Sequence, residues 1–122
     1  MLIADFSDAC SVSLAKKFAK CCKQIAKEYE GQAWGYLSKS DRYYAATPDA
    51  EAILVGAYQY CMENGCTAEA YCNKSAVGIA QLARIRQAAG INSDIQKVCF
   101  EEAEEALQHL TDILTKVGKD NN

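Results

Sequence analysis

The chain has 122 residues, of which 50% are hydrophobic and 24% are charged, and its formal net charge is -3. This length suits one domain, because two smaller domains would each bury too little apolar surface to offset the entropy of ordering. We predict a single domain over 1–118 and a frayed tail over 119–122. The weak negative charge argues against a protein that mainly neutralises a nucleic-acid backbone, and no apolar run approaches the roughly 20 residues that cross a bilayer.

The N-terminal stretch predicts a cytoplasmic protein. Asp5 and Asp8 stand where a secretory signal would have positive charge and then an uninterrupted apolar run. Export by that route is therefore not expected.

A first amphipathic helix is predicted near Asp8 to Glu30. Apolar side chains fall on one side of its helical wheel. The opposite side has a narrow row of lysines: Lys16, Lys20, Lys23 and Lys27. Four cations in line could contact phosphates, an anionic membrane surface or an acidic protein. A solvated helix face would have the same pattern, so the row by itself identifies no ligand.

The next segment predicts a short helix from about Gln32 to Ala45. It also mixes aromatic and basic side chains, which can stack a base and hold its phosphate or contact a protein partner. One arginine from later in the chain lies on an apolar helix side and could join them. The candidate ligand or partner site therefore has five members beside the lysine row: Trp34, Tyr36, Arg42, Tyr43 and Arg86. The alternative is that the tryptophan belongs to the core.

The clearest helix signal predicts a helix from Pro48 to Glu63. Thr47 is a suitable N-cap, and proline favours the first helical position. Apolar side chains surround nearly the whole axis, which is hard to bury in a small monomer. We therefore predict a homo-oligomer, with self-association through Val55, Tyr58 and Met62.

Two further helices are predicted, Ala68 to Ala89 and Asp94 to Val117. Thr67 and Ser93 are candidate N-caps. No run alternates apolar and polar residues over more than a few positions, and β-branched residues are sparse. The predicted fold is all-α: an antiparallel helical bundle of four main helices plus one short helix.

The chain is cysteine-rich, with seven cysteines, and most fall where a helix would bury them. Free cysteine packs as a small hydrophobe, so reduced core thiols are the main interpretation. The alternatives are a cross-link between Cys61 and Cys72 or between two chains, and redox chemistry through Cys61, Cys66 or Cys72. The single histidine, His109, lacks the repeated Glu-x-x-His pair of a diiron bundle, so no metal, cofactor or catalytic residue is predicted.

Three functional hypotheses follow. The first is a non-enzymatic interaction module that self-associates and binds a protein partner. The second is a binder of a small anionic ligand such as a nucleotide, and the third is a thiol redox protein.

Overall fold

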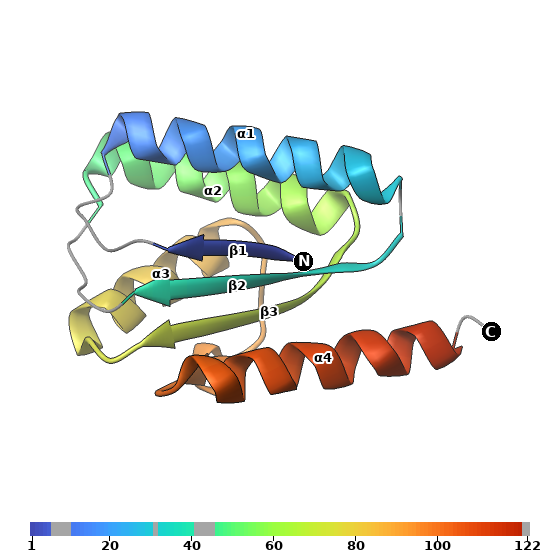
Figure 1. The fold of residues 1–122 in the computed structure, drawn as a ribbon. Helices are drawn as coiled ribbons and strands as arrows, with labels where there is room; N and C mark the ends of the chain where they lie inside the picture. The colour runs from blue at the N-terminus through green and yellow to red at the C-terminus, as the bar shows by residue number, and fades with distance from the viewer. Residues whose placement is uncertain (6–10, 31, 41–45, 121–122) are drawn as a thin grey trace.

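A four-stranded parallel sheet with helices on both faces forms the centre of the molecule (Figure 1). The computed structural model describes residues 1–5, 11–30, 32–40 and 46–120. The strands lie in chain order across the sheet: β1 (Leu2–Asp5), β2 (Trp34–Ser40), β3 (Cys66–Asn73) and β4 (Cys99–Phe100). The predicted all-α antiparallel bundle is therefore wrong.

Helices α1 (Val12–Tyr29), α2 (Pro48–Glu63) and α3 (Ala76–Ala88) connect successive strands, and α4 (Ala103–Asp120) follows β4. Figure 1 shows α1 and α2 side by side over one face of the sheet and α4 under the other. The helix predicted near Asp8 to Glu30 is present as α1, which begins at Val12, and the helix predicted from Pro48 to Glu63 is present as α2 with the predicted bounds. Thr47 caps α2, since its hydroxyl accepts a hydrogen bond from the Ala50 N–H at 3.2 Å.

The predicted short helix from Gln32 to Ala45 is wrong where the structure describes it, because this segment contains β2. Side chains alternate between the two faces of a strand. Trp34 and Tyr36 lie under the helices α1 and α2, whereas Gly35 and Leu37 face α4. The glycine lets α4 approach closely, since a Cβ there would lie 3.1 Å from Leu114 Cδ1.

The predicted helix from Ala68 to Ala89 is wrong in its first part, which is β3. A tight turn precedes this strand, and Gly65 there has a φ of 98°, which favours glycine. The helix of this segment begins later, at α3, where the Ser75 hydroxyl accepts a hydrogen bond from the Gly78 N–H. Thr67, the predicted cap, instead lies within the strand.

The last predicted helix, Asp94 to Val117, is also wrong in its first part. That part contains the short 3-10 helix η1 (Ile95–Lys97) and strand β4 before α4 begins. Asp94 caps η1, because its carboxylate accepts a hydrogen bond from the Gln96 N–H at 3.0 Å.

Each face of the sheet has its own core. Under α1 and α2, Phe18 packs against two tyrosines, Tyr36 and Tyr58, and a third, Tyr71, packs against both of them, with ring centroids 5.4–6.5 Å apart. We call these tyrosines, from β2, α2 and β3, the tyrosine cluster: Tyr36, Tyr58 and Tyr71. Under α4 the core is smaller, and it contains Leu37, Ala68, Ala70, Ala106 and Leu110. The small side chains of β3 there allow α4 to pack close to the sheet.

Candidate interaction surface

The residues predicted for self-association do not form one exposed patch. Tyr58 is buried in the tyrosine cluster, and Val55 is half-buried. Of the three, only Met62 is exposed, with 38% of its surface accessible to solvent. The apolar side chains around α2 are largely covered within the chain, by α1, α3 and the sheet.

The predicted aromatic and basic ligand site is not assembled in the described residues. Trp34 is 1% exposed and donates from Nε1 to the Asn64 carbonyl at 2.8 Å, so it is a core residue. Tyr36 is buried in the tyrosine cluster. Arg42 and Tyr43 lie outside the described residues. Lys39, from the same tract, is half-buried on the opposite face of the sheet from Tyr36.

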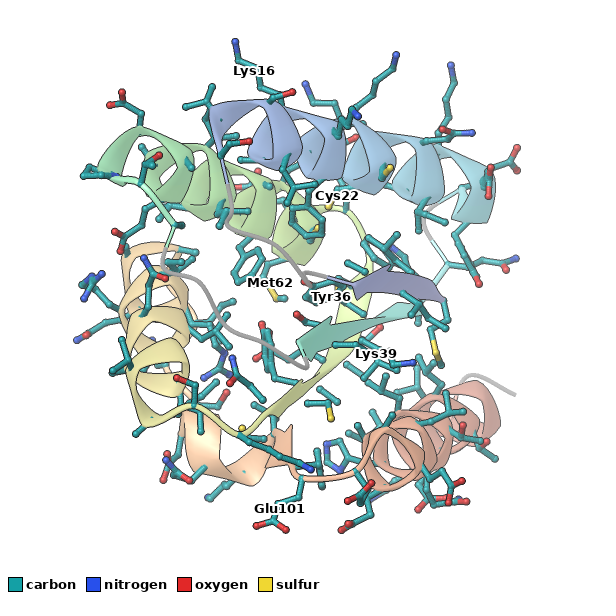
Figure 2. All side chains as sticks on the ribbon, turned by 60° about the vertical axis from the view of Figure 1, so that its left-hand side comes forward. Lys16, Cys22, Tyr36, Lys39, Met62 and Glu101 are labelled. Carbon is teal, nitrogen blue, oxygen red and sulfur yellow. The ribbon has the colours of Figure 1, made fainter. Side chains whose placement is uncertain are left out.

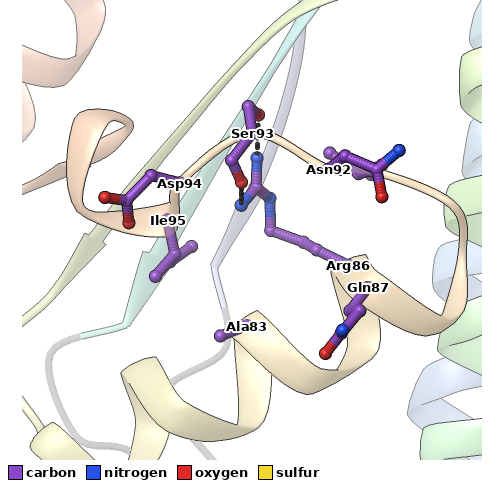
Figure 3. Close-up of a pocket in the computed structure, with 8 residues that line it drawn as sticks. Ala83, Arg86, Gln87, Asn92, Ser93, Asp94 and Ile95 are labelled. Carbon is purple, nitrogen blue, oxygen red and sulfur yellow. Dashed lines mark hydrogen bonds between the residues drawn. The ribbon is translucent and has the colours of Figure 1, made fainter.

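Arg86, a member of the predicted ligand site, is 1% exposed and paired with a buried carboxylate. Its Nε donates to Glu69 Oε1 at 2.8 Å, and its Nη2 donates to the same oxygen. The guanidinium also donates to the Ser93 carbonyl at 2.9 Å and to the Ser93 hydroxyl at 2.8 Å, as Figure 3 shows. A cavity of about 250 Å³ adjoins this site. Since Glu69 neutralises the arginine, the cavity has no free cation with which to attract a nucleotide.

Three buried cysteines meet between α1, α2 and the start of β3, and we call them the thiol cluster: Cys22, Cys61 and Cys66. Contact with the Cys61 thiol, followed by burial, raises the pKa of Cys22, while the same contact lowers the pKa of Cys61. Burial raises the pKa of Cys66 to about 12. Cys61 is buried in this cluster, whereas Cys72 lies in β3 and its thiol donates to the Glu101 carbonyl at 3.3 Å, so the alternative of a cross-link between Cys61 and Cys72 is not formed.

The lysine row is exposed, as its place on the helical wheel predicts. Lys16 points away from the sheet, whereas Cys22 on the same helix points inward (Figure 2). Lys23 lies over the ring of Tyr60, 6.0 Å from its centroid. The remaining lysines of the row, Lys20 and Lys27, are also exposed.

Beside this row, the free edge of β1 and the flank of α1 form a groove of about 150 Å³. Strand β1 is the first strand of the sheet, and within the described residues no strand pairs with its outer side. The groove has seven lining residues: Leu2, Ile3, Ala4, Leu14, Lys17, Phe18 and Cys21. Ile3 is 56% exposed, which is unusual for a large apolar side chain on a strand.

The wall that α1 contributes to this groove is positively charged. Helix α1 has five lysines and one glutamate. Lys17 lies in the groove itself, about 100° around the helix from Lys16. Sequence reasoning missed both Lys17 and Ile3, because their importance depends on the strand Leu2–Asp5, which is too short to give a clear alternating pattern.

The strand order offers no crevice of the usual kind. In open α/β sheets, ligands bind where neighbouring connections leave the sheet on opposite faces. Here the strands follow chain order, so right-handed connections keep α1, α2 and α3 on one face. No helix of the described chain is long and apolar enough to cross a membrane. Among the described residues, the histidine, the cysteines and the carboxylates form no group that could hold a metal ion. No family model, curated protein or solved structure matches this chain.

Proposed function

We propose that this protein is an interaction module whose β1 edge receives an extended, acidic segment of a partner protein. One observation carries the proposal: an edge strand with an exposed isoleucine lies next to a groove that contains a lysine. Free strand edges present unpaired N–H and C=O groups that an added strand can use. The groove supplies side-chain selectivity in addition to main-chain bonds.

The two faces of β1 predict an alternating pattern in the partner. Side chains of an added strand point alternately to opposite faces of the sheet. On one face they would enter the groove beside Leu14 and Lys17, and on the other they would pack against the exposed Ile3. We therefore expect alternation of apolar side chains with at least one carboxylate placed opposite Lys17.

Charge favours an acidic partner over a second copy at this edge. Two copies paired through β1 about a two-fold axis would place their α1 helices close together, each with five lysines and one glutamate. Like charges that meet across an interface weaken it. Self-association therefore stays a separate prediction, which sedimentation at micromolar concentration can test.

A peptide selection with charge-reversed variants tests the proposal. Random 12-residue peptides displayed on phage are selected on the intact protein, and those enriched are synthesised and titrated. Lys17→Glu is expected to weaken binding about tenfold at low ionic strength and less at high salt. Lys116→Glu is the matched control, because it makes the same charge change on exposed α4, on the other face of the sheet. The double variant Lys20→Glu/Lys23→Glu measures how far the lysine row adds to Lys17.

Cys21 provides an independent readout of where the peptide binds. Its thiol is exposed and lines the groove, so bound peptide should slow its alkylation by iodoacetamide. Selected peptides without alternation and acidic residues would contradict the proposal. So would binding that leaves Cys21 unprotected and is equally sensitive to Lys17→Glu and Lys116→Glu.

A further inference from the structure

A second feature lies at the other side of the sheet, where β3 is only partly covered. Strand β4 pairs with just two residues of β3, Tyr71 and Cys72. The Tyr71 N–H donates to the Val98 carbonyl at 2.7 Å, so the main-chain groups of Tyr71 face β4. Main-chain groups of alternate strand residues face the same side. The N–H and C=O of Glu69 therefore face the region beyond the end of β4, where no described strand pairs with them.

A cavity of about 210 Å³ occupies this region. Its apolar wall comes from α2, from the connection between α3 and β4, and from α4: Met62, Ile91, Val98 and Ile113. Its polar wall comes from β3, the same connection and α4: Thr67, Glu69, Ser93 and His109. A mostly apolar cavity with a few convergent polar groups is typical of small-molecule sites.

His109 gives this cavity an unsatisfied hydrogen-bonding group. Its Nε2 is buried and has no hydrogen-bond partner in the described part of the chain. The ring packs against Phe100, with centroids 5.1 Å apart, which limits its orientation. Buried polar atoms are usually hydrogen-bonded in folded proteins, so a ligand group that reaches Nε2 would satisfy this atom.

The charges of the site favour a neutral ligand. The Glu69 carboxylate is already engaged, because Oε1 accepts from Arg86 and Oε2 accepts from the Tyr71 hydroxyl at 2.9 Å. Arg86 is in turn bonded to Ser93. Neither the carboxylate nor the guanidinium is left to pair with an ionic ligand.

We infer that this cavity binds a small neutral diamide with an apolar side chain, of the N-acyl amino-acid amide type. In a parallel ladder, the N–H of one residue donates to the C=O of the residue before its partner, and its C=O accepts from the N–H of the residue after its partner. A diamide presents these two groups, so it would extend the ladder of β4 along Glu69. Its side chain would lie among Ile91, Val98 and Ile113, and a remaining amide group would bond to His109 Nε2.

Nuclear magnetic resonance offers two site-specific probes for this inference. His109 is the only histidine, and Met62 is one of two methionines, so each gives a readily assigned side-chain signal. Titration with N-acetyl-leucine methylamide should shift both signals and saturate in the millimolar range. The control ligand is the same compound with both amide nitrogens methylated, which has no N–H to donate and should bind at least about tenfold more weakly.

Two variants test the roles of the cavity residues. His109→Phe keeps an aromatic ring beside Phe100 but removes Nε2, and it should weaken binding about tenfold when Met62 is observed. Val98→Phe should fill the cavity and abolish the shifts, with folding checked by Trp34 fluorescence. Absence of saturable shifts in the unaltered protein would overturn the inference, as would equal binding of the methylated control. Unchanged affinity in His109→Phe would overturn the bond to Nε2.

Discussion

The buried pair of Glu69 and Arg86 is expected to show strong energetic coupling. Replacing Arg86 by methionine leaves the carboxylate buried, with only the Tyr71 hydroxyl as a side-chain partner. Replacing Glu69 by leucine leaves the guanidinium buried against Ser93. Removal of one member of such a pair costs about 3–5 kcal/mol, because the other charge stays buried and uncompensated.

The double variant Glu69→Leu/Arg86→Met is expected to cost less than its parts. Together the two single losses amount to about 6–10 kcal/mol. The double variant removes both charges and leaves two orphaned groups, the Tyr71 hydroxyl and the Ser93 carbonyl, while the hydroxyl of the exposed Ser93 can bond to water. Each orphaned group costs about 1–3 kcal/mol, so the double variant should lose about 2–6 kcal/mol.

Urea unfolding followed by tryptophan fluorescence measures these values. Trp34 is the only tryptophan and is buried, so its emission reports the loss of the core. A small domain has only about 5–15 kcal/mol of stability, so the loss in one of the single variants can prevent folding. In that case the double-mutant cycle cannot be completed. Ser93→Ala then serves as a milder test, since it removes one acceptor of the guanidinium and should cost about 1 kcal/mol. A double variant that loses the full sum of the single losses would refute the coupling.

The packing of the sheet and the thiols leads to three further expectations. Gly35→Val should lower the free energy of unfolding by about 1–3 kcal/mol, since its side chain meets Leu114, and an unchanged urea midpoint would contradict this contact. Burial raises the pKa of every hydroxyl in the tyrosine cluster. Unfolded tyrosine ionises near pH 10, so stability should fall as the pH rises above about 10. Alkaline ultraviolet titration should show three tyrosines that ionise only on unfolding. Iodoacetamide should label Cys21 well before the thiol cluster, and mass spectrometry that found equal rates in the folded protein would contradict the burial of that cluster.

Local signals in the sequence made two of the helices, α1 and α2, predictable. Thr47 and Pro48 define the start of α2 through capping and backbone geometry, which act within a few residues. The periodicity of α1 is likewise a property of one segment. Both patterns identify a helix without information on what it packs against.

The strands were missed because their stability depends on neighbours far away in the chain. In β3, Ala68, Glu69 and Ala70 have better helix than strand propensity. They are held extended by β2 and by α4, which packs closely against the two alanines. In β2, apolar side chains point to both faces, Trp34 and Tyr36 to one and Leu37 to the other, so this strand lacks the alternation of apolar and polar residues that would identify it.

The candidate sites were predictable only in part for the same reason. The lysine row follows from the wheel of α1 alone, and it is exposed as expected. The groove needs β1 beside α1, and the burial of Arg86 needs Glu69, which precedes it by 17 residues. Contacts of this kind depend on the sheet, so a prediction of an all-α fold could not locate them.

Chain-order pairing of the strands also bears on how the molecule assembles. Each of β2, β3 and β4 pairs with the strand before it, but these parallel pairings join residues 28–34 positions apart in the chain, such as Tyr71 with Cys99 and Leu2 with Tyr36. Pairing of this kind is intrinsically slow. Leu37, Ala68 and Ala70 also stay open to water until α4 docks from the C-terminal side. Variants that weaken α4 are thus expected to aggregate during synthesis, when this apolar face has been made but not yet covered.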